Sequence, residues 1–278
     1  MAVTAAMVKQ LREMTGAGIM DAKKALVEND GDTEAAVDWL RKKGLATAAK
    51  KAGRIAAEGL VGIRIDGSAG VVVEVNSETD FVAKNSEFQS LVSDILKLAI
   101  ESPDLETLLA SDIGGRTVKD AVTEKVATIG ENLSLRRMRK VVGGGVVGYV
   151  HNSPSKNLGK IGALVAYNGG DGHAARQIAL HVAASRPLSL SENDLPADAI
   201  EREKNVLAEQ ARESGKPEAV IEKMIAGRLR KYFEEVTLLN QKYVFDQDQN
   251  IRSFAENAGI EIVDFVRFEV GEGIEKNG

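Results

Sequence analysis

The sequence of 278 residues contains no cysteine, few aromatic residues and a single tryptophan. The lack of cysteine excludes disulfides, thiolate metal ligands, iron–sulfur clusters and a cysteine nucleophile. Aromatic residues make up 4% of the chain, which leaves little material for the stacking platforms that bind single-stranded nucleic acid. The longest apolar run, residues 141–150, is far shorter than the roughly 18 residues of a membrane helix. Residues 1–4 show neither the charged nor the apolar region of a secretory signal, so we expect a cytoplasmic protein.

The charge balance is acidic, with 41 Asp and Glu residues against 36 Lys and Arg residues. This balance disfavours a general nucleic-acid binder, which usually carries a basic excess. Basic clusters nevertheless occur at residues 41–43, at Lys50-Lys51 and at residues 136–140. We interpret them as solvated faces of helices and strands. Contact with RNA phosphates is the alternative that the sequence leaves open.

Apolar residues at helical spacing predict three short helices between Thr4 and Gly44. Asp32 is suited to cap the start of the third helix, and Gly44 is suited to cap its end. We therefore expect a three-helix domain over residues 1–45. A basic, alanine-rich linker or short helix is expected over residues 46–56.

The hydrophobic period then changes from helical to alternating. Two β-branched runs flank Asp66-Gly67 and predict a hairpin. A capping-box pattern, Ser86-Glu87-Phe88-Gln89, predicts the start of a helix that continues to Leu98. Further elements are expected as helices over 105–110 and 118–129 and as a strand over 133–138.

The same order of elements recurs after Gly143. Strands are expected over 145–150 and 161–167, followed by a helix over 174–184 and a closing strand over 260–268. These two similar units predict an α+β fold with a duplicated hairpin–helix–strand core. The first subdomain covers residues 57–142, and the second covers residues 143–195 and 241–278.

Residues 196–240 interrupt the second unit and read as an inserted antiparallel helical hairpin. Its helices are expected over 200–213 and 218–239, around the turn Ser214-Gly215-Lys216-Pro217. The second helix carries an apolar stripe, which is expected to face either the sister helix or a partner. Self-association through this hairpin is therefore possible. The stripe consists of Ile221, Met224, Ile225, Leu229, Tyr232 and Val236.

The sequence offers little support for catalysis. Residues 143–148 formally match G-x-G-x-x-G, but a strand is predicted there instead of the helix that a dinucleotide site needs. The histidines His151, His173 and His181 lack metal-ligand spacing, and His181 is expected to pack inside the protein. No combination of nucleophile and base stands out. We expect no catalytic residue, metal ion or cofactor.

The segment Thr79-Asp80-Phe81-Val82 is unusual because it lies between a predicted strand and a predicted helix, where a loop is expected. Phe81 is either a plug buried under that loop or an exposed wedge. Composition alone favours the plug, since burial of a phenylalanine contributes about 1.5–3 kcal/mol.

This segment resembles the signature loop of the bacterial elongation factor Ts family. Residues 11–26 resemble the family's other signature, and residues 181–185 and 267–273 also match its pattern. The resemblance implies an exchange factor for the GTPase elongation factor Tu, with a three-helix N-terminal domain like the ubiquitin-associated domain. It implies a role without covalent chemistry, nucleic-acid contact or membrane contact.

The resemblance also implies roles for particular residues. The loop Thr79, Asp80, Phe81 and Val82 would disturb the magnesium site of the GTPase, with Phe81 as the intruding ring, so here the wedge is preferred. Arg12, Ile19 and Met20 match partner contacts of the N-terminal domain, and Ile129 and His151 match contacts of the core. Leu11 is added because Leu11, Ile19 and Met20 offer apolar surface beside a polar helix face.

Three features depart from the family pattern. Ile19 stands where methionine is common, which changes the shape but keeps an apolar side chain. The disulfide that joins two copies of some members cannot form without cysteine. The sequence ends at Gly278, so the extra C-terminal helix of some members is expected to be absent.

Overall fold

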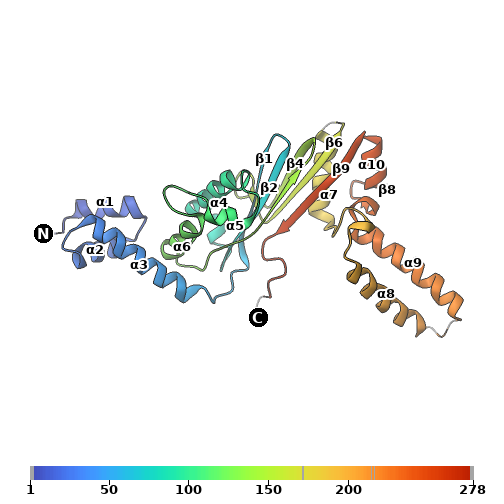
Figure 1. Cartoon of the computed structure of the whole chain (residues 1–278), viewed down its shortest axis with the longest axis horizontal. Helices are drawn as coiled ribbons and strands as arrows, with labels where there is room; N and C mark the ends of the chain where they lie inside the picture. The colour runs from blue at the N-terminus through green and yellow to red at the C-terminus, as the bar shows by residue number, and fades with distance from the viewer. Residues whose placement is uncertain (1–2, 171, 214, 216, 276–278) are drawn as a thin grey trace.

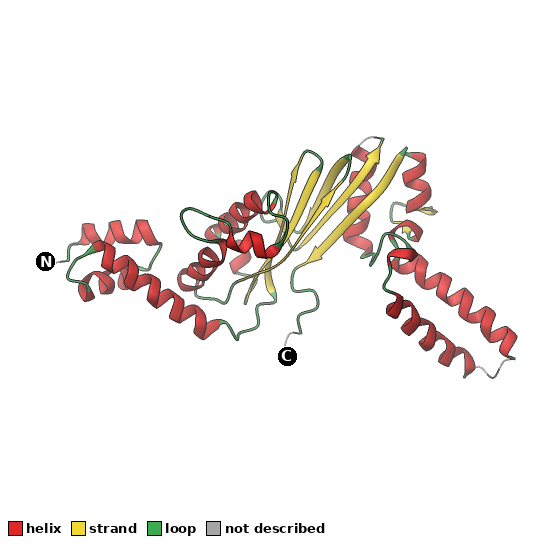
Figure 2. Ribbon diagram, viewed as in Figure 1, coloured by secondary structure: helices red, strands yellow, loops and turns green. Residues whose placement is uncertain are grey.

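The computed structural model describes residues 3–170, 172–213, 215 and 217–275. The molecule is elongated and mixes helices with strands, which is compatible with the α+β class. The first three helices form one end, two sheets with their covering helices form the middle, and a helical hairpin projects at the other end (Figures 1 and 2).

The N-terminal unit comprises α1 (Ala5–Thr15), α2 (Ile19–Glu28) and α3 (Thr33–Lys51). The Thr4 hydroxyl accepts a hydrogen bond from the Met7 amide, and α1 ends at Gly16 in the left-handed conformation. Asp32 caps α3 as predicted, by accepting from the Ala35 amide at 3.0 Å. The small core of this unit consists of Leu11, Ala22, Ala25, Leu26 and Ala36.

The predicted end of the third helix at Gly44 is wrong, because α3 continues without interruption to Lys51. Gly44 lies inside the helix, where an added Cβ would stand 3.3 Å from the Cβ of Ala127 on α6 (Val118–Ile129). Gly44 therefore serves the close approach of two helices instead of a helix end. The non-helical part of the predicted linker is confined to residues 52–56.

The predicted first hairpin forms, with β1 (Glu58–Asp66) antiparallel to β2 (Ala69–Ser77). The sheet has the strand order β3-β2-β1-β5, where β3 is Ser134–Val142 and β5 is Leu158–Gly159. The helices α4 (Ser86–Ala99), α5 (Leu105–Ala110) and α6 enclose a core with this sheet. The cap of α4 differs from prediction: Asn85 accepts from the amides of Glu87 and Phe88, and Ser86 is the first helical residue.

The second sheet has the order β4-β6-β9, formed by β4 (Gly145–His151), β6 (Ile161–Gly169) and β9 (Ile260–Glu269). Its middle strand follows β4 through a hairpin, as β2 follows β1, so both sheets place their strands in equivalent order. The helices α7 (Gly172–Ser185) and α10 (Ile251–Asn257) pack on it and share its core.

The two sheets pack against each other through a third apolar cluster, formed by side chains of β1, β2, β3, β4, β6 and β9. Glycines make this contact close. An added Cβ at Gly148 would stand 2.6 Å from Ile63, and one at Gly70 would stand 2.6 Å from Val146. The glycines that superficially resemble a nucleotide motif therefore serve strand formation and sheet packing, since β4 begins at Gly145.

The projecting hairpin consists of α8 (Ala197–Arg212) and α9 (Glu218–Val236), which begin and end within a few residues of the predicted bounds. In the predicted stripe of α9, Ile221 is buried and the other five residues are half-buried, so the sister helix covers part of it. Short elements link the hairpin to the second sheet: η2 (Glu192–Asp194), η3 (Leu238–Asn240), β7 (Lys242–Tyr243) and β8 (Asp246–Asn250).

Candidate functional site

The Phe81 loop, which we define as residues 78–85, joins β2 to α4 and presents its tip to solvent. Phe81 is 75% exposed, whereas its neighbour Val82 is 6% exposed and belongs to the first core. The interpretation of Phe81 as a buried plug is therefore wrong. Val82 fills that role instead, so the predicted part of Val82 in the action of the loop would come through the fold of the loop and not through an exposed side chain. Asp80 and Phe81 remain as the exposed pair at the tip.

Hydrogen bonds fix the loop on both sides of this tip. On the N-terminal side, the Thr79 amide and hydroxyl donate to the two carboxylate oxygens of Glu131 at 2.9 and 2.6 Å. On the C-terminal side, η1 (Val82–Lys84) forms a helical turn, and the Gln89 side chain donates to the Ala83 carbonyl at 2.9 Å. The tip is thus held in one conformation without burying Phe81.

The N-terminal unit presents a second exposed apolar surface. Ile19 and Met20 begin α2 directly after Gly18, and their side chains are 58% and 74% exposed. Met14, at the end of α1, is 60% exposed, and Arg12 is also exposed. Leu11 is fully buried, so its prediction as a partner contact is wrong. Its side chain faces the other helices of the unit, where it fills their core.

The end of α6 connects these two surfaces. An added Cβ at Gly16 would stand 3.7 Å from Thr128, so the turn between α1 and α2 lies against the last turn of α6. Ile129 follows, half-buried against the first core. Glu131, two residues further, holds Thr79. The structure therefore brings the N-terminal surface, Ile129 and the Phe81 loop together around one helix end.

His151 lies at the same end of the sheets as the Phe81 loop. Its carbonyl accepts from the Lys160 amide at 3.0 Å, and the Lys160 ammonium pairs with Glu58 at 2.7 Å. Glu58 in turn stands opposite Ser77, from which the Phe81 loop departs. The ring of His151 is exposed, and its Nδ1 lies within hydrogen-bond distance of the Tyr149 hydroxyl, at 3.0 Å.

Beside His151 is a cavity of about 430 Å³ that sequence reasoning missed. Its wall includes Tyr149, Ile161, Leu180 and Phe245. Phe245 is 63% exposed and contacts the Tyr243 ring edge-on. The Tyr243-Val244-Phe245 run is a concentration of aromatic side chains in a chain poor in them. That concentration was the available signal for an exposed aromatic position.

A family model described as Elongation factor TS matches residues 78–272, which begin at the Phe81 loop. The elongation factor Ts of Jannaschia sp. (strain CCS1) is 59% identical over 276 residues, which cover 99% of this chain and 95% of the relative. The chain belongs to the elongation factor Ts family. Membership places it among the translation elongation factors of protein biosynthesis, in a family of nucleotide exchange factors.

Other members of the elongation factor Ts family show the same extent of similarity. The relative from Ruegeria sp. (strain TM1040) is 60% identical over 275 residues, and that from Paracoccus denitrificans (strain Pd 1222) is 59% identical over 280 residues. Both matches cover 99% of this chain and at least 94% of the relative. The similarity therefore includes the N-terminal unit, which the family model leaves out.

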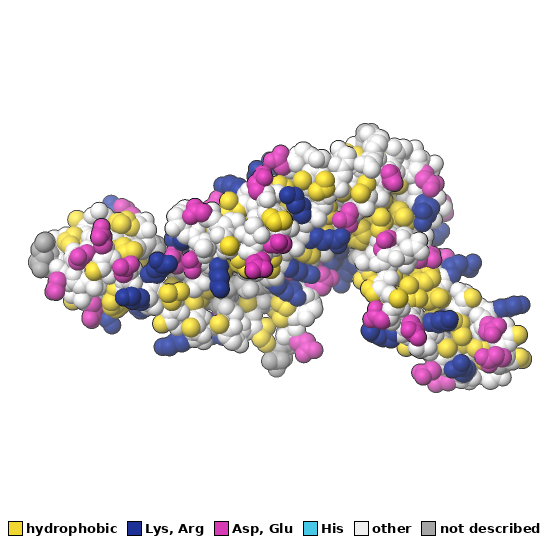
Figure 3. Space-filling view, in the orientation of Figure 1, with side chains coloured by type: hydrophobic (Ala, Val, Ile, Leu, Met, Phe, Trp, Pro, Cys, Tyr) yellow, Lys and Arg dark blue, Asp and Glu magenta, His cyan; other side chains and the backbone are white. Residues whose placement is uncertain are grey.

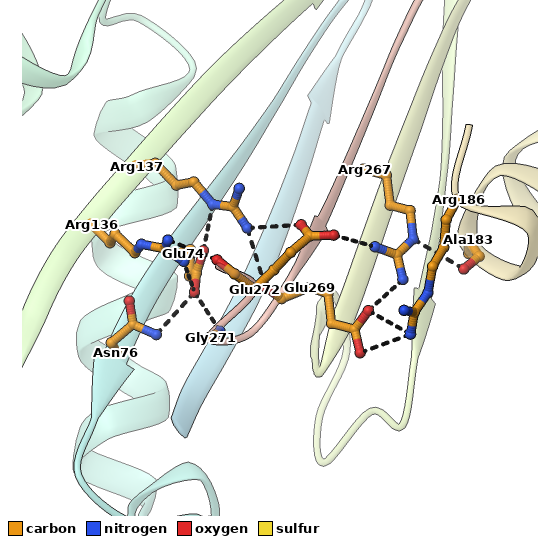
Figure 4. A network of polar contacts seen from close by, with 10 residues as sticks. All are labelled: Glu74, Asn76, Arg136, Arg137, Ala183, Arg186, Arg267, Glu269, Gly271 and Glu272. Carbon is orange, nitrogen blue, oxygen red and sulfur yellow. Dashed lines mark hydrogen bonds and ion pairs between the residues drawn. The ribbon is translucent and has the colours of Figure 1, made fainter. Parts of the chain in front are cut away.

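The strongest basic cluster of this family member is engaged within the fold instead of forming a solvated face. Figure 4 shows Arg136 and Arg137 against the buried carboxylate of Glu74, at 3.2 and 2.5 Å. Arg139 pairs with Asp264 at 2.8 Å, and Lys140 donates to the Ile100 carbonyl. Intramolecular acceptors thus occupy these four cations. This correction also weakens the RNA alternative, because phosphate contacts need cations that are free to leave their partners.

His181 is fully buried, as predicted, and its contacts define its tautomer. The Gln241 amide donates to the carbonyls of Ser185 and Glu235, so its oxygen is left to accept from His181 Nε2 at 2.9 Å. Nδ1 then accepts from the Val244 amide at 3.3 Å. Burial lowers the pKa of His181 below its ordinary value of 6.5, which keeps the ring neutral.

The described residues offer no grouping of three or more His, Asp and Glu side chains that could hold a metal ion. Among the same residues, no helix combines the length and the apolar composition needed to span a membrane. The surface around the Phe81 loop combines an exposed ring with exposed apolar side chains of the N-terminal unit.

Proposed function

We propose that this chain promotes GDP release from the GTPase elongation factor Tu by inserting Phe81 near the magnesium site of that partner. The observation that carries the proposal is the tip of the Phe81 loop, where a phenylalanine is 75% exposed and yet held on both sides. An exposed aromatic ring gains free energy when a partner buries it. A ring that is already fixed also loses little conformational freedom on binding.

The physical mechanism is a competition between two ligands of one partner. Magnesium bridges the nucleotide phosphates and the side chains of a GTPase. An apolar ring among those side chains disturbs their geometry and supplies no substitute ligand. The factor then binds the nucleotide-free partner better than the GDP-bound partner. By linkage, GDP weakens binding of the factor by the same ratio as the factor weakens binding of GDP.

The remaining contact residues would supply affinity. Arg12, Ile19 and Met20 are exposed on the N-terminal unit, while Ile129 and His151 lie on the core near the Phe81 loop. Asp80 would accompany Phe81 into the contact. Thr79 and Val82 would act indirectly, since one is bonded to Glu131 and the other is buried.

The factor itself is expected to need no cofactor and to bind no guanine nucleotide. The strand that begins at Gly145 provides support, because a dinucleotide-binding glycine motif would open a helix there. Titration calorimetry of the isolated chain with GDP should give no binding at micromolar concentrations. Micromolar affinity would contradict the proposal.

Stopped-flow release of a fluorescent GDP analogue from purified elongation factor Tu is the deciding experiment. Addition of the chain should accelerate release, and the rate should saturate as its concentration rises. An unchanged release rate would refute the proposal. The alternative, an RNA-binding protein, predicts RNA affinity that falls steeply with salt, a dependence that GDP release does not share.

The architecture implied by this function has four parts. We infer a ubiquitin-associated-like domain over residues 1–45, two related core subdomains, and an inserted hairpin over 196–240. The equivalent strand orders of the two sheets support the duplication. The hairpin exposes apolar side chains, including Val206 and Val220, which provide a surface for contact with a second copy. Figure 3 shows apolar side chains on the surface of the hairpin. Action on a translation factor implies the cytoplasm.

A further inference from the structure

The Phe81 loop and the segment after α6 exchange hydrogen bonds in both directions. Glu131 accepts from the amide and the hydroxyl of Thr79, at 2.9 and 2.6 Å. In return, Glu78 accepts from the Asn132 amide at 2.6 Å. Each segment thus offers one carboxylate to a backbone amide of the other. Hydrogen bonds to a charged acceptor are about twice as strong as neutral ones, so this reciprocal clamp is a firm connection.

The chain that leads from the N-terminal unit meets the same clamp. The Asn132 side chain donates to the Arg54 carbonyl at 2.8 Å, and the Arg54 guanidinium lies 3.4 Å from Glu78. Lys51, the last residue of α3, donates to the Gly130 carbonyl. Residues 130–132, which directly follow α6, are therefore contacted both by the Phe81 loop and by the chain at and after the end of α3.

We propose that Glu131 is a positioning residue for Phe81, which fixes the exposed ring in the direction that the partner requires. This inference rests on the function proposed above. Glu131 touches no nucleotide and no reacting group, and it acts only through Thr79. The two hydrogen bonds to Thr79 hold the loop two residues before Phe81, at the point where β2 has ended.

Contacts other than those of Glu131 hold the C-terminal side of the Phe81 loop. Val82 and Ala83 are buried in the first core, and Gln89 holds the Ala83 carbonyl. These contacts anchor the C-terminal side whether Glu131 is present or not. On the N-terminal side, the bonds of Glu78 to Asn132 and of Ser77 to the Thr79 carbonyl remain without Glu131. Removal of Glu131 therefore loosens this side only, so that Phe81 samples a wider range of directions above an intact core.

The test combines exchange kinetics with a direct probe of Phe81. Glu131→Ala removes both charge-assisted hydrogen bonds to Thr79 and should lower the saturated GDP-release rate about tenfold or more. The concentration of factor for half-saturation should stay within about twofold, because the N-terminal surface is unaltered. Thr79→Val, which removes only the hydroxyl bond, should lower the rate by a smaller factor and is the second variant if Glu131→Ala fails to fold.

The control is Glu124→Ala, which removes a carboxylate of α6, the helix that ends just before Glu131. Glu124 pairs with Arg116 at 2.5 Å and makes no contact with the loop among the hydrogen bonds and ion pairs of the described residues. This variant should leave the saturated rate unchanged. A Glu131→Ala rate equal to that of the unmodified chain would overturn the proposal.

A spectroscopic measurement separates this inference from the proposed function. In a Trp39→Phe background, Phe81→Trp places the only tryptophan at the loop tip, and its anisotropy decay reports the freedom of that side chain. Glu131→Ala should add a fast, large-amplitude component that Glu124→Ala lacks. Identical decays would refute the positioning role even if exchange were never observed. If the unmodified chain did not accelerate GDP release from elongation factor Tu, that result would instead refute the proposed function alone.

Discussion

Phe81 and Val82 are neighbours in sequence with opposite surroundings. The loop turns into a short helix at Val82, so that side chain enters the first core while the preceding ring points to solvent. The free protein keeps an apolar ring in water, at a cost that only a bound partner can offset. The exposure of Phe81 therefore fits the proposed binding role, and the burial of Val82 serves the stability of the fold.

Phe81→Ala should leave the free energy of unfolding within about 0.5 kcal/mol of the unmodified chain, as for ordinary surface substitutions. It should slow GDP release at saturating factor, since the intruding ring is gone while other contacts persist. Denaturation curves and stopped-flow release measure the two effects. Phe88→Ala is the control, because that ring is fully buried and its loss typically costs about 3–5 kcal/mol. A large stability loss in Phe81→Ala would mean that the ring is structural.

Met20→Asp should weaken the complex with the GTPase and leave the N-terminal unit folded, because the Met20 side chain is 74% exposed. Titration calorimetry measures the affinity. Fluorescence of Trp39 in α3 follows the melting of the unit itself. Leu11→Asp provides the contrast, since a buried carboxylate in that small core should unfold the unit. If Met20→Asp also abolished the Trp39 transition, Met20 would be a core residue.

At the scale of elements, the contact between α3 and α6 determines where the N-terminal unit sits. Gly44 allows the two helices to approach, and Lys51 extends from the end of α3 to the Gly130 carbonyl. Because α3 is one uninterrupted helix, its packing on α6 also orients α1 and α2. The exposed surface at Ile19 and Met20 is therefore placed by a glycine more than twenty positions away in sequence.

Gly44→Leu should separate α3 from α6 and destabilise the Trp39 transition by about 1–3 kcal/mol, as overpacked sites do. The matched control is Gly227→Leu in α9, where an added Cβ meets no atom within 4 Å. That substitution should stabilise α9 by about 0.5–1 kcal/mol, because leucine has the higher helix propensity. Thermal denaturation followed by fluorescence and circular dichroism reports both. Equal effects at the two sites would show that Gly44 has no packing role.

The stability of the fold around His181, which lies on α7 and contacts Gln241 after the helical hairpin, should depend on pH. Burial lowers the pKa of this ring in the folded chain, so below its ordinary value of 6.5 the unfolded chain binds the proton more readily. Stability is then complete above pH 6.5 and falls as the pH decreases toward the lowered folded value. Each pH unit in that window should remove up to about 1.4 kcal/mol.

Melting curves between about pH 7.5 and pH 5.5 measure this dependence. Protonation would also place an N–H of Nδ1 against the Val244 amide, which donates to that nitrogen. His181→Gln should have a lower melting temperature at neutral pH and a weaker decline in acid. An unchanged decline would assign the pH dependence to other groups.

Much of the secondary structure was predictable because local patterns determine it. The alternation around Asp66-Gly67 gave the first hairpin, and Asp32 gave the start of α3. Gly44 was misassigned because a helix end and a close helix contact both favour glycine, and only Ala127 distinguishes them. The burial of Leu11 likewise could not be predicted locally, because it depends on how α2 and α3 pack against α1. Among site residues, the exposure of Phe81 came from resemblance, since composition favoured burial.

At the scale of the whole molecule, the C-terminal segment ties the two sheets together. Glu74 on β2 is fully buried and accepts from Arg136, Arg137, Asn76 and the Gly271 amide. Arginines also contact two carboxylates at the C-terminal end of the chain. Arg186 and Arg267 contact Glu269, whereas Arg137 and Arg267 contact Glu272 (Figure 4). The network spans both sheets, so the surfaces near Phe81 and His151 are held in one body.

Glu74→Gln should destabilise the core by about 3 kcal/mol, the lower end for a broken buried ion pair, because both arginines are partly exposed and Arg137 keeps Glu272. Urea denaturation measures the loss. Glu87→Gln is the control, since its pair with Lys125 is exposed and should contribute within about 0.5 kcal/mol. Equal midpoints for the two variants would contradict a structural role of the network.

The bond from the Gly271 amide to Glu74, 2.7 Å long, joins residues 197 positions apart. A ribosome adds that many residues in about 10–40 s, at the usual rate of 5–20 residues per second. Until the end of that interval the Glu74 carboxylate lacks this one partner, so water must take the place of the Gly271 amide. The first sheet can therefore form with Arg136 and Arg137 on Glu74, but the hydrogen bonds of this carboxylate are complete only once the segment after β9 has been made.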